Sequence, residues 1–381
     1  MNENRFLSLA RQVMTLPTAP FHERFVSDWV KAYVRTRRRL SLNVDEYGNL
    51  MLIYRGTEVA GEAAPELVAT AHIDHPGLGW LERAGDRIHV FEMLGGTNLD
   101  QARQARARIF RPDGPADQPG ILGTVVEVVP GDGNRRAAIH VQVPRAADAR
   151  IEAGCFGMWA LPAWKLSGRR IHCRACDDLG GAAVGLAFLE DLARRRAEVC
   201  AGLLLTRAEE AGLLGMVAAA QTEVVPADAL LVNLECSNTR AGAPLGEGSV
   251  VRVGDRVQTF DPDLTAALDA AGRELAATAP GFRYQRKLMD GGTCEATVLA
   301  GSGYRAAAIA LPLGNYHNIG DERLQAEIIH LDDALGAVDL LSHLARAPGG
   351  AAGALARWQE RRGQQWTQRF NQTAERLRST V

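Results

Sequence analysis

Hydrophobic residues recur at helical spacing near the start of the chain, over residues 20–36. The apolar positions in this stretch are Phe25, Val26, Trp29, Val30, Tyr33 and Val34. Side chains three and four positions apart lie on one face of a helix, so the spacing predicts the first helix here, beginning at Pro20. Two extended runs separated by the turn pair Tyr47-Gly48 follow, and then comes the apolar run of residues 66–74. These runs are predicted strands.

The middle of the chain has a different pattern. Residues 81–165 consist of short extended runs broken by glycine, proline and aspartate, with no helical period. This pattern predicts a small β-barrel-like domain. Residues 166–346 then alternate between helix-like and strand-like segments, which is typical of an α/β fold whose sheet is sandwiched between helices. We therefore predict a main domain of residues 1–80 and 166–346, into which the small β domain is inserted.

The C-terminal tail, residues 347–381, places its large apolar residues along one helical face. These residues are Leu355, Trp358, Trp366, Phe370 and Leu377. Such a stripe usually packs on its own domain, and contact with another subunit is the functional alternative.

Composition narrows the class of protein. The 381 residues are 46% hydrophobic and 23% charged, with a net charge of −2, as expected of a globular protein with at least two cores. The dense basic runs, residues 37–39 and 194–196, are too short for a nucleic-acid surface, and no apolar run is long enough to cross a membrane. Six scattered cysteines suit a reducing compartment. We therefore expect a cytoplasmic protein with neither nucleic-acid nor membrane partners.

Potential metal ligands follow the apolar runs at five places. They are His72 with Asp74, Asp177 with Asp178, Glu209 with Glu210, Glu235, and His317. In α/β folds the ends of neighbouring strands meet at the edge where ligands bind. On an extended chain residues two apart share a face, so Asp74 can hold one nitrogen of His72 while the other nitrogen faces a metal. Taken singly, each residue also has a structural explanation, such as a core histidine, a helix cap or a salt bridge.

Taken together, two histidines and several carboxylates form the ligand set preferred by zinc, cobalt or manganese. One carboxylate shared by two ions can bridge them, as in two-metal hydrolases. We therefore expect two divalent metal ions, zinc first among them. The pair Cys173 and Cys176 has the spacing of a redox or zinc motif, but one such pair is weak evidence, and packing explains it better.

The motifs HID, CDDLGG, RAEEAGLLG, NLE, GGT and YHN occur in this order between residues 15 and 345. Their order and spacing resemble the M42 family of co-catalytic zinc aminopeptidases, which is related to the M20 and M28 peptidases. The resemblance implies that His72, Asp177 and Glu235 hold one metal ion. It likewise implies that Asp177, Glu210 and His317 hold the other. Glu209 would be the general base, with Asp74 beside it in the catalytic set.

The resemblance has further implications for the peptide backbone and for assembly. A cis peptide bond is expected between Asp177 and Asp178. The inserted β domain would support subunit association and shape access to the site, so a homo-oligomer is expected.

The sequence departs from the family pattern at three places. Glu235 stands where the family usually has aspartate. Cys294-Glu295 replaces Asp-Ala, and Asn318-Ile319 replaces the Ser-Pro that follows the histidine. These changes leave the metal set intact and bear on substrate preference.

The function expected from the resemblance is removal of the N-terminal residue of short peptides, by a metal-bridged hydroxide with Glu209 as base. An N-acyl amino-acid hydrolase or carboxypeptidase is an alternative, because related enzymes use similar metal sites. A non-catalytic scaffold with a structural metal is another, although such a site has no use for an extra unliganded carboxylate such as Glu209. A glycosidase is disfavoured, because adjacent carboxylates rarely flank a bond at ~5 to 9.5 Å.

Overall fold

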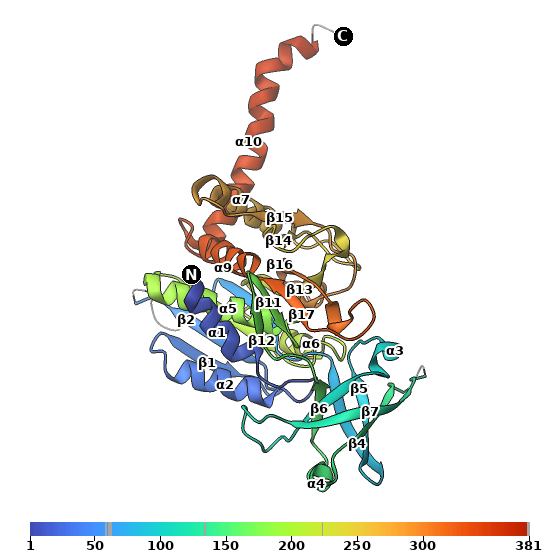
Figure 1. Ribbon diagram of the computed structural model, residues 1–381. Helices are drawn as coiled ribbons and strands as arrows, with labels where there is room; N and C mark the ends of the chain where they lie inside the picture. Colours follow the sequence, from blue (N-terminus) through green and yellow to red (C-terminus); the bar gives the residue numbers. More distant parts are fainter. Residues whose placement is uncertain (58, 60–62, 133–134, 223, 379–381) are drawn as a thin grey trace.

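An eight-stranded mixed sheet forms the centre of the computed structural model, in the order β1-β2-β12-β3-β13-β16-β14-β15 (Figure 1). In that order the strands are Leu40–Val44, Leu50–Arg55, Cys200–Thr206, Leu67–His72, Leu230–Asn238, Arg305–Leu313, Ser249–Arg252 and Tyr284–Lys287. The four central strands, β12, β3, β13 and β16, are parallel to one another. The structure describes residues 1–378 except 58, 60–62, 133–134 and 223.

Helices cover both faces of this sheet. One face shares a hydrophobic core with α1 (Glu3–Met14), α2 (Arg24–Arg35), α5 (Leu179–Arg195), α7 (Pro262–Thr278) and α9 (Leu331–Ala345). The other face shares a second core with α6 (Leu214–Gln221) and α8 (Glu295–Gly301). Strand β2 shows why both faces are covered, because its alternate residues point to opposite sides. Leu50, Leu52 and Tyr54 enter the first core, while Met51 and Ile53 enter the second. The predicted sheet between helices is confirmed.

The inserted segment closes into a six-stranded antiparallel barrel, in the order β4-β5-β8-β7-β6-β9. These strands are Gly77–Gly85, Ile88–Leu94, Ala138–Gln142, Ile121–Val129, Arg106–Phe110 and Phe156–Trp159. The barrel encloses its own core and carries the short helices α3 (Leu99–Ala102) and α4 (Arg145–Asp148). It confirms the predicted β-barrel-like domain, and its first strand begins four residues before the predicted residue 81.

A small three-stranded sheet completes the strand set. It consists of β10 (Lys165–Ser167), β11 (Arg170–Cys173) and β17 (Glu327–His330). Two 3-10 turns, η1 (Thr239–Ala241) and η2 (Tyr316–Asn318), follow β13 and β16 respectively. Because β17 pairs with β11, it joins two segments that are about 150 residues apart in sequence.

The N-terminal helices differ from the prediction. The first helix is α1, which the hydrophobic spacing over residues 20–36 did not indicate, and Asn2 caps it by accepting from Asn4 N–H at 3.0 Å. Helix α2 begins at Arg24, four residues after Pro20. The apolar residues of α1 are buried against α5, so tertiary packing explains why the short helix is stable.

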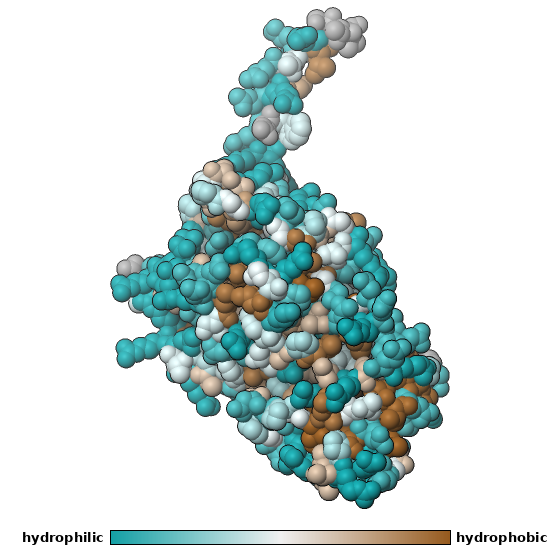
Figure 2. All heavy atoms as spheres, in the orientation of Figure 1, coloured by the Kyte–Doolittle hydropathy of each residue, from teal (hydrophilic) through white to brown (hydrophobic). Residues whose placement is uncertain are grey.

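The tail forms one long helix, α10 (Gly350–Arg378), which projects from the body (Figure 1). Its first part packs on α7 and α9, and Leu355 is buried there. Farther along, Trp366 is 68% exposed and Phe370 55% exposed. The expectation that the stripe packs on its own domain is therefore correct only for the beginning of the helix. The projecting part is largely hydrophilic on the visible face (Figure 2). Within the described residues, no helix combines the length and apolar character needed to cross a membrane.

Candidate metal centre

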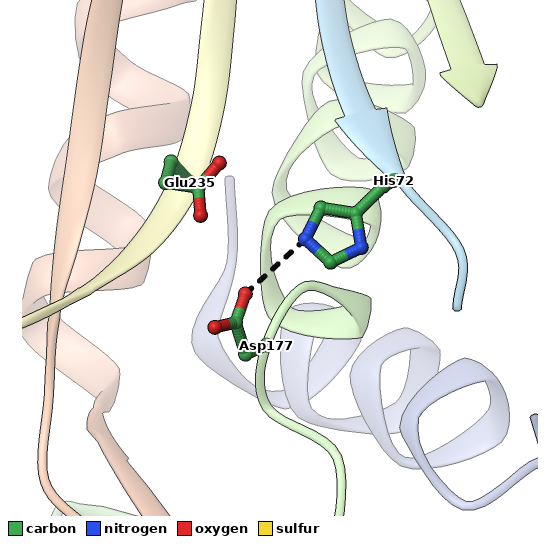
Figure 3. A group of neighbouring side chains, drawn as sticks. All are labelled: His72, Asp177 and Glu235. Carbon is green, nitrogen blue, oxygen red and sulfur yellow. Dashed lines mark ion pairs between the residues drawn. The ribbon is translucent and has the colours of Figure 1, made fainter. Parts of the chain in front are cut away.

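His72, Asp177 and Glu235 converge on one buried point (Figure 3). His72 is the last residue of β3, Asp177 precedes α5, and Glu235 lies in β13. Nε2 of His72 is 3.3 Å from Oδ1 of Asp177, and one potential ligand atom from each of the three residues lies within 4.8 Å of the others. None of the three residues is more than 7% exposed. This is the first of the two ligand groups expected from the sequence.

A second group consists of Asp177, Glu210 and His317. Nε2 of His317 lies 3.2 Å from Oε1 of Glu210 and 3.8 Å from Oδ2 of Asp177. Asp177 therefore belongs to both groups and directs one carboxylate oxygen to each histidine. The two groups are adjacent and share this single carboxylate.

The parallel strands explain why residues so distant in sequence meet. The carboxyl ends of β3, β12, β13 and β16 lie at one edge of the sheet, and the turns that follow these strands carry most of the polar residues. Glu235 does not end its strand as expected, because β13 continues to Asn238. The bond between Asp177 and Asp178 is cis, as expected. Asp178 caps α5 by accepting from the backbone N–H of Gly181 at 3.1 Å.

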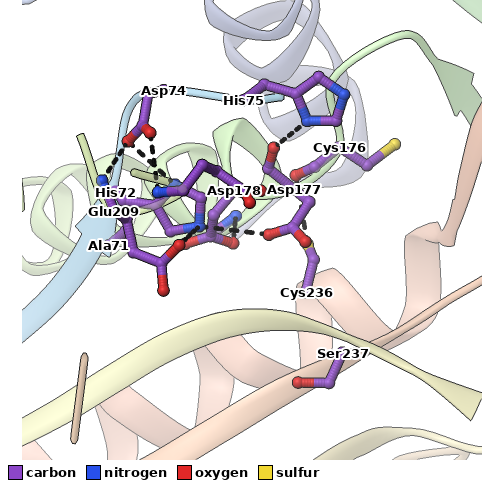
Figure 4. Close-up of polar contacts among 12 residues, drawn as sticks. Ala71, His72, Asp74, His75, Cys176, Asp177, Asp178, Glu209, Cys236 and Ser237 are labelled. Carbon is purple, nitrogen blue, oxygen red and sulfur yellow. Dashed lines mark hydrogen bonds and ion pairs between the residues drawn. The ribbon is translucent and has the colours of Figure 1, made fainter. Parts of the chain in front are cut away.

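Asp74 contacts His72 on one side and the segment that follows β12 on the other (Figure 4). Its Oδ1 accepts from the backbone N–H of Glu209 and its Oδ2 from that of Glu210, both at 3.0 Å. Oδ1 is also 3.4 Å from Nδ1 of His72. The side chain of Glu209 turns toward the same histidine, with Oε2 3.9 Å from Nε2. Asp74 therefore holds both acidic residues that follow β12 beside His72.

Burial, with repulsion from neighbouring carboxylates, raises the pKa of two glutamates in this site. Burial raises the pKa of Glu209 well above its usual range, and neighbouring carboxylates add to the effect while His72 opposes it. Burial also raises the pKa of Glu235, and the charge of Asp177 raises it further. For His72, burial disfavours the charged ring, but the surrounding carboxylates outweigh burial and raise its pKa. A cation among these groups would relieve the repulsion that adds to the shifts of Glu209 and Glu235.

The unpaired atoms of the site suit metal ions. Buried atoms without a hydrogen-bond partner include both ring nitrogens of His72, Oδ1 of Asp177, Oε1 of Glu210 and Oε2 of Glu235. Buried polar atoms are normally paired, so this concentration of unpaired donors and acceptors requires an explanation. Imidazole and carboxylate together form the N/O donor set that zinc and similar divalent ions bind. The residues present therefore fit a metal centre.

Sequence reasoning missed three buried polar residues around the centre. His75 lies with Nδ1 2.6 Å from the backbone oxygen of Asp177. Glu327 accepts hydrogen bonds from the backbone N–H groups of Cys176, Asp177 and His317. Glu295 is fully buried and hydrogen-bonded to Thr206, and burial raises its pKa to about 7. Only Glu295 had a signal in the sequence, as a departure from the family pattern.

Asn318, the residue after His317, is also part of this network. Its Oδ1 is 3.1 Å from Nε2 of His75, and its Nδ2 donates to the backbone oxygen of Arg174 at 3.0 Å. This departure from the family's serine therefore has a structural role. Cys173 and Cys176 are buried free thiols, and Sγ of Cys173 donates to the backbone oxygen of Ala163 at 2.9 Å, in keeping with the packing interpretation.

Comparison with known proteins gives an independent view of this arrangement. A sequence model described as M42 glutamyl aminopeptidase matches residues 48–340. No curated protein matches the sequence. Many solved structures share the fold.

Three archaeal structures illustrate the similarity. A TET aminopeptidase from a marine sediment thaumarchaeon has a TM-score of 0.74 at 18% identity, over 90% of this chain and 97% of its own. An aminopeptidase from Desulfurococcus kamchatkensis has a TM-score of 0.72 at 20% identity, over 91% and 96%. The TET1 peptidase of Pyrococcus horikoshii, which assembles into a tetrahedron or a large octahedral shell, has a TM-score of 0.72 at 18% identity, over 90% and 100%. At these identities the structures establish the fold that the chain shares with them.

Proposed function

The chain belongs to the M42 glutamyl aminopeptidase family of peptide hydrolases, and from this premise we propose that it is a two-metal aminopeptidase that removes the N-terminal residue of short peptides. One observation carries the proposal. Two groups of potential metal ligands share the carboxylate of Asp177, which lies between His72 and His317. A single shared carboxylate is the arrangement that bridges two ions in two-metal hydrolases.

The proposed ligand roles follow the two groups. His72, Asp177 and Glu235 would hold one divalent ion, and Asp177, Glu210 and His317 the other. Zinc fits the N/O donor set, as do cobalt and manganese. When bound, such ions would supply Lewis-acid chemistry by lowering the pKa of water and polarising the scissile carbonyl.

Glu209 is the proposed general base. Its carboxylate lies beside His72 and is only 12% exposed. Glu209 also forms a group of potential metal ligands with His72 and Glu210, but once Glu210 is assigned to the ion held with His317, Glu209 is left to act as the base. It would take a proton from the attacking water and return that proton to the leaving amine. Asp74 would orient the base and His72 through the contacts described above. The low exposure of these groups limits bulk water around the reacting bond.

The choice of an aminopeptidase over an N-acyl amino-acid hydrolase or carboxypeptidase rests on the family. We further propose that the main domain, residues 1–80 and 166–346, carries the chemistry, and that the inserted domain, residues 81–165, shapes access to it. A cytoplasmic location is supported by the six free cysteines.

We also propose that the protein is a homo-oligomer in which the C-terminal tail, residues 347–381, contacts a second copy. Residues 350–378 contain six arginines and two glutamates, a net charge of +4, whereas the rest of the chain holds 37 basic and 43 acidic residues, a net charge of −6. Two copies of α10 would repel each other, while the acidic body of another copy attracts the helix. The exposed Trp366 and Phe370 would supply the apolar contact.

A panel of aminoacyl anilides tests this function. Each substrate is offered with a free amine and as its N-acetyl derivative, to protein depleted of metal and then reconstituted with zinc, cobalt or manganese. We expect the depleted protein to be inactive, reconstitution to restore activity, and only free-amine substrates to be cleaved. Cleavage of the acetylated forms alone would favour the N-acyl hydrolase. Folding and inactivity regardless of metal would indicate a scaffold.

A further inference from the structure

Glu327 is a buried carboxylate that binds backbone rather than a cation. It is the first residue of β17 and is 0% exposed. Its Oε2 accepts from the backbone N–H of Cys176 at 2.7 Å and of Asp177 at 2.9 Å, while Oε1 accepts from that of His317 at 2.9 Å. Among the described residues, the ion-pair contact of Glu327 is with Nδ1 of His75, at 3.9 Å.

Burial of the Glu327 carboxylate costs free energy, so packing alone does not explain a glutamate at this position. A buried carboxylate must be stabilised by opposite charge or by hydrogen bonds. Here the hydrogen bonds come from three backbone donors, and the side chain has no lysine or arginine partner within the part of the chain described. An apolar residue at this position would leave those three backbone donors buried and without a hydrogen-bond partner, which destabilises a folded protein.

The donors belong to the two segments that carry metal ligands. Residues 176 and 177 precede α5, and His317 lies in η2, 140 residues later. Asp177 is common to both ligand groups, and His317 belongs to the second. One rigid side chain therefore sets the position of the shared ligand relative to a ligand of the second group. The contact is made through main-chain atoms, so it leaves both ligand side chains free to bind.

The backbone C=O of Asp177 is also held in place, by a different residue. This oxygen lies 2.6 Å from Nδ1 of His75, whose Nε2 is 3.1 Å from Oδ1 of Asn318. Asn318 follows His317 directly, and its Nδ2 donates to the backbone oxygen of Arg174 at 3.0 Å. The N–H and C=O of Asp177 are thus fixed from two directions, and both connections lead back to η2.

We propose that Glu327 is a positioning residue that fixes Asp177 and His317 in the geometry required to bind the second metal ion. The inference rests on the proposed two-metal function. Two of the three ligands in the group of Asp177, Glu210 and His317 depend on Glu327, whereas one ligand depends on it in the group of His72, Asp177 and Glu235. The ion of the second group is therefore the one that loses more affinity when Glu327 is changed.

A purely structural role is the competing explanation, because the backbone of Glu327 pairs with Cys173 in the small sheet. The chain offers a matched control for it. Asp333 is also 0% exposed, and its carboxylate accepts from the backbone N–H groups of Gly246 and Gly248, both at 2.8 Å. It lies in α9, and within the described part of the chain its hydrogen bonds go to Gly246 and Gly248 and not to residues 176–177 or 317, so Asp333→Asn should lower stability without acting on the metal centre.

The experiment compares Glu327→Gln, Glu327→Asp and Asp333→Asn with the unaltered protein. Glutamine keeps the shape but replaces one acceptor oxygen with an N–H₂ group that faces a backbone donor. Metal-free protein is titrated with zinc against a competing chelator, and with cobalt while the visible absorption spectrum is recorded. The stability of each metal-free variant is measured by urea unfolding.

We expect the first equivalent of metal to bind Glu327→Gln almost normally and the second to bind 10- to 100-fold more weakly, with an altered cobalt spectrum. Glu327→Asp, which keeps the charge on a shorter side chain, should recover part of the affinity. Asp333→Asn should lose stability while both equivalents bind normally. Unchanged second-site affinity in Glu327→Gln, or equal weakening in Glu327→Gln and Asp333→Asn, would overturn the positioning role. The proposed function itself fails on a different result, namely that the unaltered protein binds no metal and hydrolyses no substrate. The two failures are therefore distinguishable.

Discussion

The carboxylate of Asp74 accepts a hydrogen bond from the backbone N–H of Glu209 at 3.0 Å. Asp74 follows β3, and Glu209 follows the neighbouring parallel strand β12. The bond therefore connects two strand ends at the edge of the sheet where the ligand groups lie. It makes the position of the proposed base depend on a residue that also lies beside His72.

Replacing Asp74 with asparagine should impair the centre without unfolding the protein. The amide retains one acceptor, so one of the two backbone donors, of Glu209 or Glu210, would face an N–H₂ group instead. Loss of such orienting contacts typically costs about 10- to 100-fold in metal affinity or activity. We expect kcat/KM to fall by that range, with Asp333→Asn as the control. Unchanged kcat/KM would show that Asp74 does not orient the site.

Glu209→Gln should separate proton transfer from metal binding. Glutamine preserves the size of the side chain but cannot accept the proton, so kcat should fall by about 10² to 10⁴ while two equivalents of metal remain bound. Glu210→Gln, by contrast, should lose metal because it removes a proposed ligand. Metal content by mass spectrometry and hydrolysis of aminoacyl anilides measure both effects. Near-normal turnover by Glu209→Gln would remove it as the base.

His22 should make the stability of the protein depend on pH. Its ring stacks on Phe156 with centroids 5.0 Å apart, and burial, aided by the charge of Arg207, lowers the pKa of His22 to about 4. In the unfolded chain His22 binds a proton below about pH 6.5, whereas in the folded chain it does so only below about pH 4. The free energy of unfolding is therefore unaffected by His22 above this range and falls as the pH drops through it.

Between pH 7 and pH 5 the loss from this group should be about 1 to 2 kcal/mol. His22→Phe keeps an aromatic ring but cannot titrate, so its free energy of unfolding should fall less over the same interval. Urea unfolding of both proteins at several pH values measures the difference. Identical pH dependence in the two proteins would contradict the assignment.

The double change Trp366→Ser and Phe370→Ser should weaken assembly and leave the body intact. Both side chains are more than half exposed, at 68% and 55%, so their loss removes little from the core. Light scattering coupled to size-exclusion chromatography should show a smaller assembly than the unaltered protein. High salt should have the same effect, because the proposed contact is partly electrostatic.

Val257→Ser is the matched control, since Val257 is 62% exposed on the body and lies outside α10. It should leave the assembly unchanged. An unaltered mass for the double variant would refute the proposed contact. Binding of the unaltered protein to anionic vesicles, lost in the double variant, would identify a lipid surface as the occupant instead.

The residues of the candidate site could be anticipated to different degrees. His72 and Glu210 follow strongly apolar runs, so their place at the strand ends was visible in the pattern. Glu235 was placed near the end of β13, but the strand extends to Asn238 because its register with β16 continues for three more residues. Helix α1 was missed, although its buried residues recur at helical spacing, at Phe6, Leu9, Ala10, Val13 and Met14.

His75 and Glu327 could not be identified from local pattern at all. A histidine after a strand and a glutamate at the start of a short strand are common, and nothing in either segment indicates a buried partner. Glu327 accepts from residues about 150 positions earlier and 10 positions earlier at once. Only the closing of β17 onto β11 brings these donors together.

The sequence by itself determined the alternation of strands and helices, the barrel-like insertion and the identity of the polar residues after the strands, because periodicity and side-chain chemistry are local properties. The family resemblance indicated that Asp177 is shared, but only the tertiary structure decided how its two oxygens face His72 and His317, and that main-chain donors from two remote segments enclose the carboxylate of Glu327. Those relations depend on strand order and on which buried groups satisfy one another, and neither is encoded in the spacing of neighbouring residues.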